Sequence, residues 1–257
     1  MAGGRARFGL IGYGSWGKVW AKVLTGHPST ELAGVASGAP ADDFLRTHKI
    51  PMMSEAELLA SGLAGVVIAG KPENRAASAE AAARAGVPAI LEKPIAFSVA
   101  EAERIKACEA APYFLYVNHN MLFSPAYRAL KAGADPEGIQ SIELELGNQG
   151  PVREYSPLWD YGPHGLAAAY DLMGNFYSRV FEWKREDGNG GSSFEIRLRL
   201  SGADTLIRVG NNFPVKVRRL KVRTPVAEWQ LDDLAPAPLT RNGAVVSVEK
   251  KLPMDAL

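Results

Sequence analysis

Phe8-Gly9-Leu10-Ile11-Gly12-Tyr13-Gly14-Ser15-Trp16-Gly17 is the stretch that decides the fold of this 257-residue chain. Its apolar start leads directly into glycines, which predicts a buried strand of a parallel sheet. After Ser15, the expected N-cap, apolar residues recur at the spacing of one helix face: Trp16, Val19, Trp20, Val23 and Leu24. The glycines therefore lie in a turn between a buried strand and an amphipathic helix.

This glycine spacing, in this setting, predicts a loop that binds the pyrophosphate of a dinucleotide. Gly12 would permit the tight turn, Gly14 would let the pyrophosphate approach the backbone, and Gly17 would let helix and strand pack closely. Free N–H groups at the helix start would donate to the phosphates. The alternative is a glycine-rich turn without a ligand. The residues expected to border the cofactor here are Gly12, Tyr13, Gly14, Ser15, Trp16 and Gly17.

Strand and helix patterns alternate through the first 117 residues. Further strands are expected at 32–36, 65–69, 88–91 and 113–117, with helices over 73–85 and 99–110. Gly86 follows the first of these helices and suits its C-terminal end. This alternation predicts an α/β, doubly wound parallel sheet of the Rossmann type.

A different pattern begins after residue 140. Apolar and polar residues alternate over 142–146 and 194–200, and further strands are expected at 206–209, 215–222 and 226–231, with a glycine-rich turn at 187–191. Period-two alternation predicts an open, mainly antiparallel sheet within an α+β domain. We therefore expect a dinucleotide-binding domain over residues 1–120 and a substrate-binding and oligomerisation domain over 121–257, joined near 118–125.

Composition excludes several classes of protein. The net charge of +1 provides no attraction to nucleic acid or to an anionic membrane surface. Apolar stretches are far shorter than a membrane span, and residues 1–7 do not resemble a signal peptide. Cys108 is the only cysteine, so neither an internal disulfide nor a cysteine metal cluster is expected. We expect a cytoplasmic protein without a metal.

The end of the second expected strand bears on the choice of cofactor. NAD-binding sequences carry an acidic residue about 20 positions after the glycine loop. Here Ser37-Gly38 stands at that strand end, and small neutral residues leave room for the 2′-phosphate of NADP. No basic residue follows immediately, and Asp42 and Asp43 lie close by. The pattern favours NADP and leaves NAD open.

Two further clusters contain candidate functional residues. Glu92-Lys93-Pro94 closes an expected strand at the sheet edge where ligands bind, although Lys93 could also extend to solvent or pair with Glu92. Asp160 and His164 are four residues apart and share a face if a helix begins there. A carboxylate beside an imidazole can fix its tautomer. The alternative is an Asp160 helix cap beside a surface histidine.

In this order, the glycine loop, Glu-Lys-Pro and Asp-x-x-x-His resemble the glucose–fructose oxidoreductase / inositol dehydrogenase / rhizopine-catabolism (Gfo/Idh/MocA) family. The segments 69–72 (Ala-Gly-Lys-Pro) and 117–120 (Val-Asn-His-Asn) resemble the family's proline loop and its exit from the first domain. The resemblance implies catalytic roles for Lys93, Asp160 and His164. It also implies cofactor contacts for these residues: Lys71, Pro72, Glu92, Lys93 and Asn120.

The departures from the family pattern affect substrate selection. Ala167 stands where the family has an acidic residue, Leu122 where it often has arginine, and Arg75 where it has histidine. Most members are also longer, with a helix after the last strand. The fold, the cofactor and the reaction class are expected to carry over, whereas the substrate is not.

The resemblance implies reversible oxidation of a secondary alcohol on a sugar, polyol or sugar derivative. His164 would act as general base, Lys93 would stabilise charge on the same oxygen, and Asp160 would orient His164 or bind a substrate hydroxyl. Two alternatives stay open: a redox-neutral lyase or glycosidase that uses bound NAD, and a non-catalytic nicotinamide-binding sensor. A homodimer or homotetramer through the open sheet is expected, because a large exposed sheet face usually needs covering.

Overall fold

The computed structural model describes residues 4–109, 114–134, 138–150, 154–174 and 178–249. The chain divides into two compact units, Met1–Asn118 and His119–Leu257. In the part of the chain that is described, no helix is long and apolar enough to cross a membrane.

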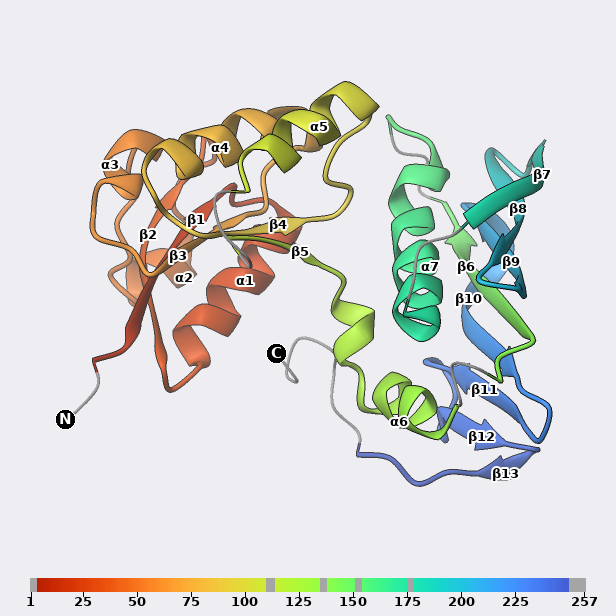
Figure 1. Ribbon diagram of the computed structural model, residues 1–257. Coiled ribbons are helices and arrows are strands. Elements are labelled where there is room, and N and C mark those ends of the chain that lie inside the picture. The colour runs from red at the N-terminus through yellow and green to blue at the C-terminus, as the bar shows by residue number, and fades with distance from the viewer. Residues whose placement is uncertain (1–3, 110–113, 135–137, 151–153, 175–177, 250–257) are drawn as a thin grey trace. The chain divides into compact units, whose positions relative to one another are not determined.

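A five-stranded sheet forms the centre of the first unit (Figure 1). All neighbouring strands are parallel, in the order β2-β1-β3-β4-β5, as the sequence predicts. The order reverses between β1 and β3, the position at which doubly wound sheets bind ligands. The strands are β1 (Ala6–Ile11), β2 (Thr30–Ala36), β3 (Gly65–Ile68), β4 (Ala89–Glu92) and β5 (Leu115–Asn118).

Helices connect these strands: α1 (Ser15–Gly26), α2 (Asp43–Thr47), α3 (Glu55–Leu59), α4 (Pro72–Arg84) and α5 (Val99–Ala107). The expectation that Ser15 caps α1 is wrong by one residue, since Gly14 takes the extended cap conformation and Ser15 is already helical. Gly17, in the first turn of the helix, lies against the carbonyl of Gly12. Gly86, at φ +68°, follows the end of α4 as expected.

The second unit contains an eight-stranded sheet in the order β13-β12-β11-β10-β6-β9-β8-β7. Its neighbours pair antiparallel except β6 and β9, so the expected mainly antiparallel sheet is confirmed. The strands are β6 (Ser141–Gln149), β7 (Ser178–Gly188), β8 (Gly191–Leu200), β9 (Ala203–Gly210), β10 (Asn212–Arg223), β11 (Glu228–Asp232), β12 (Leu239–Arg241) and β13 (Ala244–Val245).

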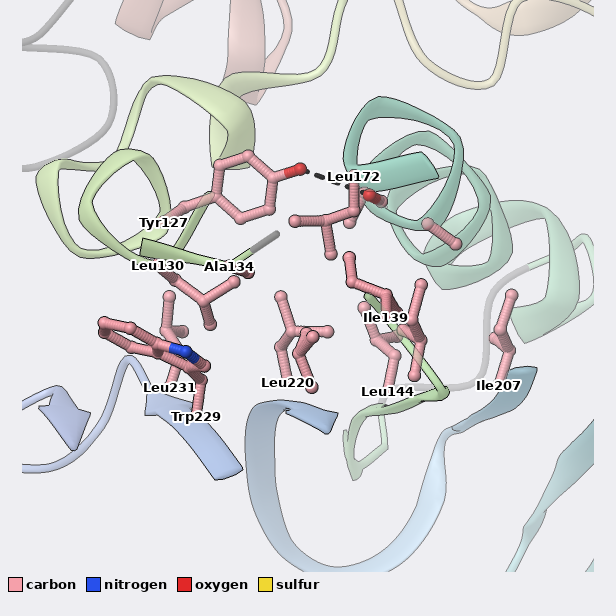
Figure 2. Packing of buried hydrophobic residues seen from close by; sticks show 14 of the residues in the cluster. Tyr127, Leu130, Ala134, Ile139, Leu144, Leu172, Ile207, Leu220, Trp229 and Leu231 are labelled. Carbon is pink, nitrogen blue, oxygen red and sulfur yellow. Dashed lines mark hydrogen bonds between the residues drawn. The ribbon is translucent and has the colours of Figure 1, made fainter. Parts of the chain in front are cut away.

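Helices α6 (Pro125–Gly133) and α7 (Pro157–Met173) cover one face of this sheet, and the short 3-10 helix η1 (Asn120–Phe123) precedes α6. Figure 2 shows apolar side chains of both helices meeting those of the strands. The Tyr127 hydroxyl on α6 lies 2.8 Å from the Asp171 carboxylate and 3.1 Å from the Ala168 carbonyl, both on α7. Lys131 pairs with Asp171 at 2.6 Å, so the two helices are tied together beside the apolar core.

The other face of the sheet carries charged side chains in rows. Residues that alternate with the buried apolar positions of the strands point outward there and form ion pairs between neighbouring strands. The pairs include Arg208 with Glu195 (2.8 Å), Arg219 with Asp232 (3.0 Å), and Arg223 with Glu143 (3.1 Å) and Glu228 (2.8 Å). This face is therefore a charged surface and not the apolar patch that an uncovered sheet would present.

Candidate cofactor-binding and catalytic site

Two of the three loop glycines are required by the packing of the first unit itself. Gly12 has a φ of +93°, and a Cβ atom on it would overlap the backbone of Gly70 in the loop after β3. A Cβ atom on Gly17 would overlap the carbonyl oxygen of Gly12. These glycines bring the start of α1, the end of β1 and the loop after β3 into direct backbone contact.

Gly14 has no such reason to be glycine. Its φ is −80°, which any residue can adopt, and it is exposed. A Cβ atom there would meet no atom of the described residues within 4 Å. Gly14 occupies the N-cap position of α1, so no side chain caps the helix, and the first turn carries no acidic residue. An uncapped helix start beside open backbone fits a phosphate group. The loop therefore fits the pyrophosphate of a dinucleotide.

Tyr13 links the glycine loop to α2. Its side chain is buried, and its hydroxyl donates to Asp42 at 2.9 Å, while Lys18 pairs with the other oxygen of Asp42 at 3.1 Å. Burial would raise the pKa of Asp42, but hydrogen bonds from Tyr13, the Leu45 N–H and Lys18 lower it to about 2. Burial, together with Asp42, raises the pKa of Tyr13 to about 12.

Ser37 and Gly38 follow β2 and carry no charge. The Ser37 hydroxyl oxygen accepts the N–H groups of Tyr13 at 3.3 Å and Ala39 at 3.1 Å, so it shapes the turn at this strand end. Gly38 is exposed, with open space where a Cβ atom would be. The carboxylate that the structure places beside the loop is that of Asp42, on the following segment.

Glu92 and Lys93 stand at the carboxyl end of β4. Glu92 is only 2% exposed, and its Oε1 accepts hydrogen bonds from the Trp20 indole and the Asn118 amide, both at 2.7 Å. Trp20 belongs to α1 and Asn118 to β5. The carboxylate therefore lies inside the unit and joins α1 to two strand ends, while the neighbouring Lys93 is half-buried.

Arg75, which the sequence analysis identifies only as a departure from the family, is a buried residue of α4 at 6% exposure. Its guanidinium donates to the carbonyls of Pro94 and Gly70, the latter at 3.0 Å. Lys71 stands at the N-cap of α4 and is exposed, and Pro72 is the first residue of the helix.

Asp160 and His164 both lie on α7 in the second unit. Ser156 caps this helix by accepting the Leu158 N–H at 3.2 Å, so the alternative of an Asp160 helix cap is wrong. Asp160 is 8% exposed and His164 is half-buried. A Cβ atom on Gly165 would come within 3.0 Å of apolar atoms of the sheet, so α7 packs closely on the sheet next to His164.

His119 is a neighbour of His164 that the sequence analysis does not single out. The two imidazole rings are arranged edge to face with centroids 6.5 Å apart. His119 stands at the N-cap of η1, and the expected cofactor residue Asn120 is the first residue of that element. The 117–120 motif contains His119, but the motif alone gives no indication that its ring meets α7.

A metal centre is not apparent in the described ranges, which contain no group of three or more histidine, cysteine or acidic side chains that could hold an ion. The structure places Lys93 in the first unit and Asp160 and His164 in the second.

Comparison with known proteins identifies the first unit. Residues 6–119 match the model of an oxidoreductase family with an NAD-binding Rossmann fold, GFO_IDH_MocA. Inositol 2-dehydrogenase from Rhizobium meliloti (strain 1021) is 32% identical over 145 residues, which is 54% of this chain and 43% of the relative. The match thus spans less than half of that enzyme.

Solved structures extend the likeness to the whole chain. A candidate oxidoreductase from Magnetospirillum magnetotacticum MS-1 superposes with a TM-score of 0.84 at 29% identity, over 98% of this chain and 89% of that one. UDP-N-acetylglucosamine 3-dehydrogenase GnnA from Acidithiobacillus ferrooxidans shares the fold, with a TM-score of 0.82 at 20% identity over 98% and 86% of the two chains. Both confirm the two-part fold class. Residues 6–119 thus match the NAD-binding Rossmann part of the Gfo/Idh/MocA oxidoreductase family.

Proposed function

We propose that this protein binds NAD(P)(H) and transfers a hydride between the nicotinamide and a secondary alcohol or ketone of a sugar, polyol or sugar derivative. The observation that carries the proposal is Gly14, at an uncapped helix start, a glycine that no contact with the described residues requires. The similarity to inositol 2-dehydrogenase supports a polyol or sugar as the class of substrate.

The side chains proposed to act are Lys93, Asp160 and His164. A bound nicotinamide would accept or return the hydride of the carbinol carbon, which is the chemistry that this chain's own residues lack. His164 takes the hydroxyl proton as general base, since an imidazole exchanges protons near neutral pH. Lys93 donates a hydrogen bond to a substrate oxygen and stabilises the negative charge that develops there.

Asp160 acts on the orientation of His164 or on a neighbouring substrate hydroxyl. It lies one helical turn before His164 on α7 and is almost completely buried. A buried carboxylate on a helix that packs closely against a sheet has little freedom to move. Asp160 is therefore suited to hold an imidazole or a hydroxyl in one orientation.

Gly14→Val tests the proposed pyrophosphate site. We expect the affinity for nicotinamide cofactors to fall by about 100-fold or more, because losing two backbone hydrogen bonds to a charged phosphate costs about 3 kcal/mol or more. Titration of NADH or NADPH fluorescence gives the dissociation constant, and circular dichroism confirms folding. Gly26→Val, at the other end of the same helix and also in open space, is the matched control. Equal affinity in the two variants would contradict the site.

Lys93→Ala and His164→Ala test the proposed chemistry. Each should lower kcat by about 100-fold or more while cofactor affinity changes little, because both groups serve one proton transfer. For the same reason, the double variant should be much less impaired than the product of the two losses. The assay is a screen of sugars and polyols with each cofactor, followed at the nicotinamide absorbance band. Product without a net absorbance change would indicate the redox-neutral alternative, and binding without turnover the sensor.

Ser37→Asp tests the choice of cofactor, for which we propose that NADP(H) binds at least as tightly as NAD(H). The neutral Ser37-Gly38 strand end supports this preference. The added carboxylate should repel the 2′-phosphate and shift the ratio of dissociation constants toward NAD(H) by about tenfold. Ser37→Ala removes the hydroxyl that accepts hydrogen bonds in the turn but adds no charge. It therefore separates the effect of the lost hydrogen bonds from the effect of the carboxylate. A clear preference of the unmodified protein for NAD(H) would contradict the proposal.

The sheet of the second unit is proposed to form a homodimer or homotetramer. Its charged face carries both signs in neighbouring rows, as a self-complementary interface requires. The edge strand β7 also exposes Val180, Phe181 and Trp183, the last at 64%. Trp183→Glu should move the mass measured by light scattering toward the monomer, whereas Val99→Glu, at an exposed apolar position of α5, should not. A monomeric unmodified protein would contradict the proposal.

A further inference from the structure

Lys93 is held on its N-terminal side by the buried carboxylate of Glu92. The Trp20 indole and the Asn118 amide both donate to the same oxygen of that carboxylate, each at 2.7 Å. Glu92 is paired with Asn118 across β4 and β5, and Trp20 reaches it from α1. The residue before Lys93 is thus fixed to a helix and to the neighbouring strand.

The C-terminal side of Lys93 is held by a different element. Arg75, from α4, donates to the carbonyl of Pro94, the residue directly after Lys93. A second nitrogen of the same guanidinium donates to the carbonyl of Gly70, in the loop after β3. One side chain therefore joins two strand-end loops, and a guanidinium has the fixed, forked donor geometry that such a connection needs.

Packing alone does not require the indole N–H of Trp20 or the guanidinium of Arg75. Elsewhere, α4 meets the sheet with small residues, Ala76, Ala79 and Ala82, which are buried without any polar contact. A phenylalanine could fill most of the space of the Trp20 ring, but only the indole can donate to Glu92. The Trp20 indole N–H and one guanidinium nitrogen of Arg75 donate to the two residues that flank Lys93, and the other nitrogen donates to Gly70.

We propose that Trp20 and Arg75 are positioning residues that hold the backbone of Lys93 from both sides. We call this pair of contacts the Lys93 clamp. Its role in function rests on the proposed function, in which the Lys93 ammonium must meet one oxygen of the substrate. A lysine side chain has four rotatable bonds, so a fixed Cα position limits the region that its ammonium can reach. A displacement of about 1 Å at a reacting group can cost about 100-fold in rate.

Trp20→Phe and Arg75→Met remove the two halves of the clamp, and Arg75→Lys retains the charge with a donor for one carbonyl. The first measurements use the protein without cofactor. In Trp20→Phe and in Arg75→Met, amide hydrogen exchange of residues 95–97 should become faster, and the reactivity of the Lys93 amine toward acetic anhydride should change. Exchange in β1 and β3 should stay as in the unmodified protein. Arg84→Met, on the same helix, and Trp229→Phe, at a buried tryptophan of the second unit, are matched controls.

With a substrate identified, Trp20→Phe should lower kcat by about tenfold, a fraction of the loss expected for a full 1 Å displacement, with cofactor affinity within about twofold. The pH profile of kcat/KM should shift, which a merely structural role would not cause, and Arg75→Lys should recover part of the loss in Arg75→Met. Folding of each variant is checked by circular dichroism, and Trp20→Phe is the conservative change if Arg75→Met does not fold.

Unchanged exchange of residues 95–97 in both Trp20→Phe and Arg75→Met would overturn the clamp, whatever the activity of the protein. Faster exchange with unchanged kcat and pH profile, in an active unmodified protein, would overturn the positioning role. If the unmodified protein neither binds nicotinamide nor turns over any substrate, the proposed function fails. The labelling of Lys93 then decides: altered reactivity in the variants supports the clamp, and unaltered reactivity overturns it.

Discussion

The backbone contact among Gly12, Gly17 and Gly70 determines how the first unit is built. A single added carbon atom at Gly12 would push the turn after β1 away from the loop after β3, and one at Gly17 would push α1 away from that turn. Because the contact fixes the start of α1, it also fixes the direction in which the free N–H groups of the helix point. It sets the position of Trp20 one turn later, and through Trp20 the end of β4.

Local sequence patterns predict most of the first unit. Short apolar runs mark its strands, and glycines mark the turns, because a buried parallel strand and a tight turn each depend on a few adjacent residues. The second unit is less predictable. Strand β7 lies at the sheet edge with exposed residues on both faces, so it has no alternation to detect. The parallel pairing of β6 with β9 joins residues about sixty positions apart, and no local pattern encodes it.

The candidate site also contains residues that local patterns predict and residues that only the folded chain reveals. Motifs identify Lys93, Asp160 and His164 because spacing along the chain is part of the motif. The surroundings of these residues depend on contacts between distant segments, and the sequence gives no sign that Arg75 reaches the carbonyl of Pro94. The meeting of His119 with His164 likewise requires the packing of η1 beside α7. Side chains that support a site are therefore found only in the folded chain.

The contact of Tyr13 with Asp42 has a consequence for how the protein responds to acidity. With Asp42 ionised above a pH of about 2 and Tyr13 protonated below about 12, neither group changes charge over the range in which cells live. The stability that the Asp42 carboxylate adds is present at neutral pH and is lost only as the pH falls from its ordinary pKa of 3.8 toward about 2. The strand end beside the glycine loop thus presents the same electrostatic surface in mild acid and in mild base. A response of cofactor binding to pH within that range must come from other groups. For NADP(H), the first to consider would be the 2′-phosphate, a phosphate monoester whose second pKa is about 6.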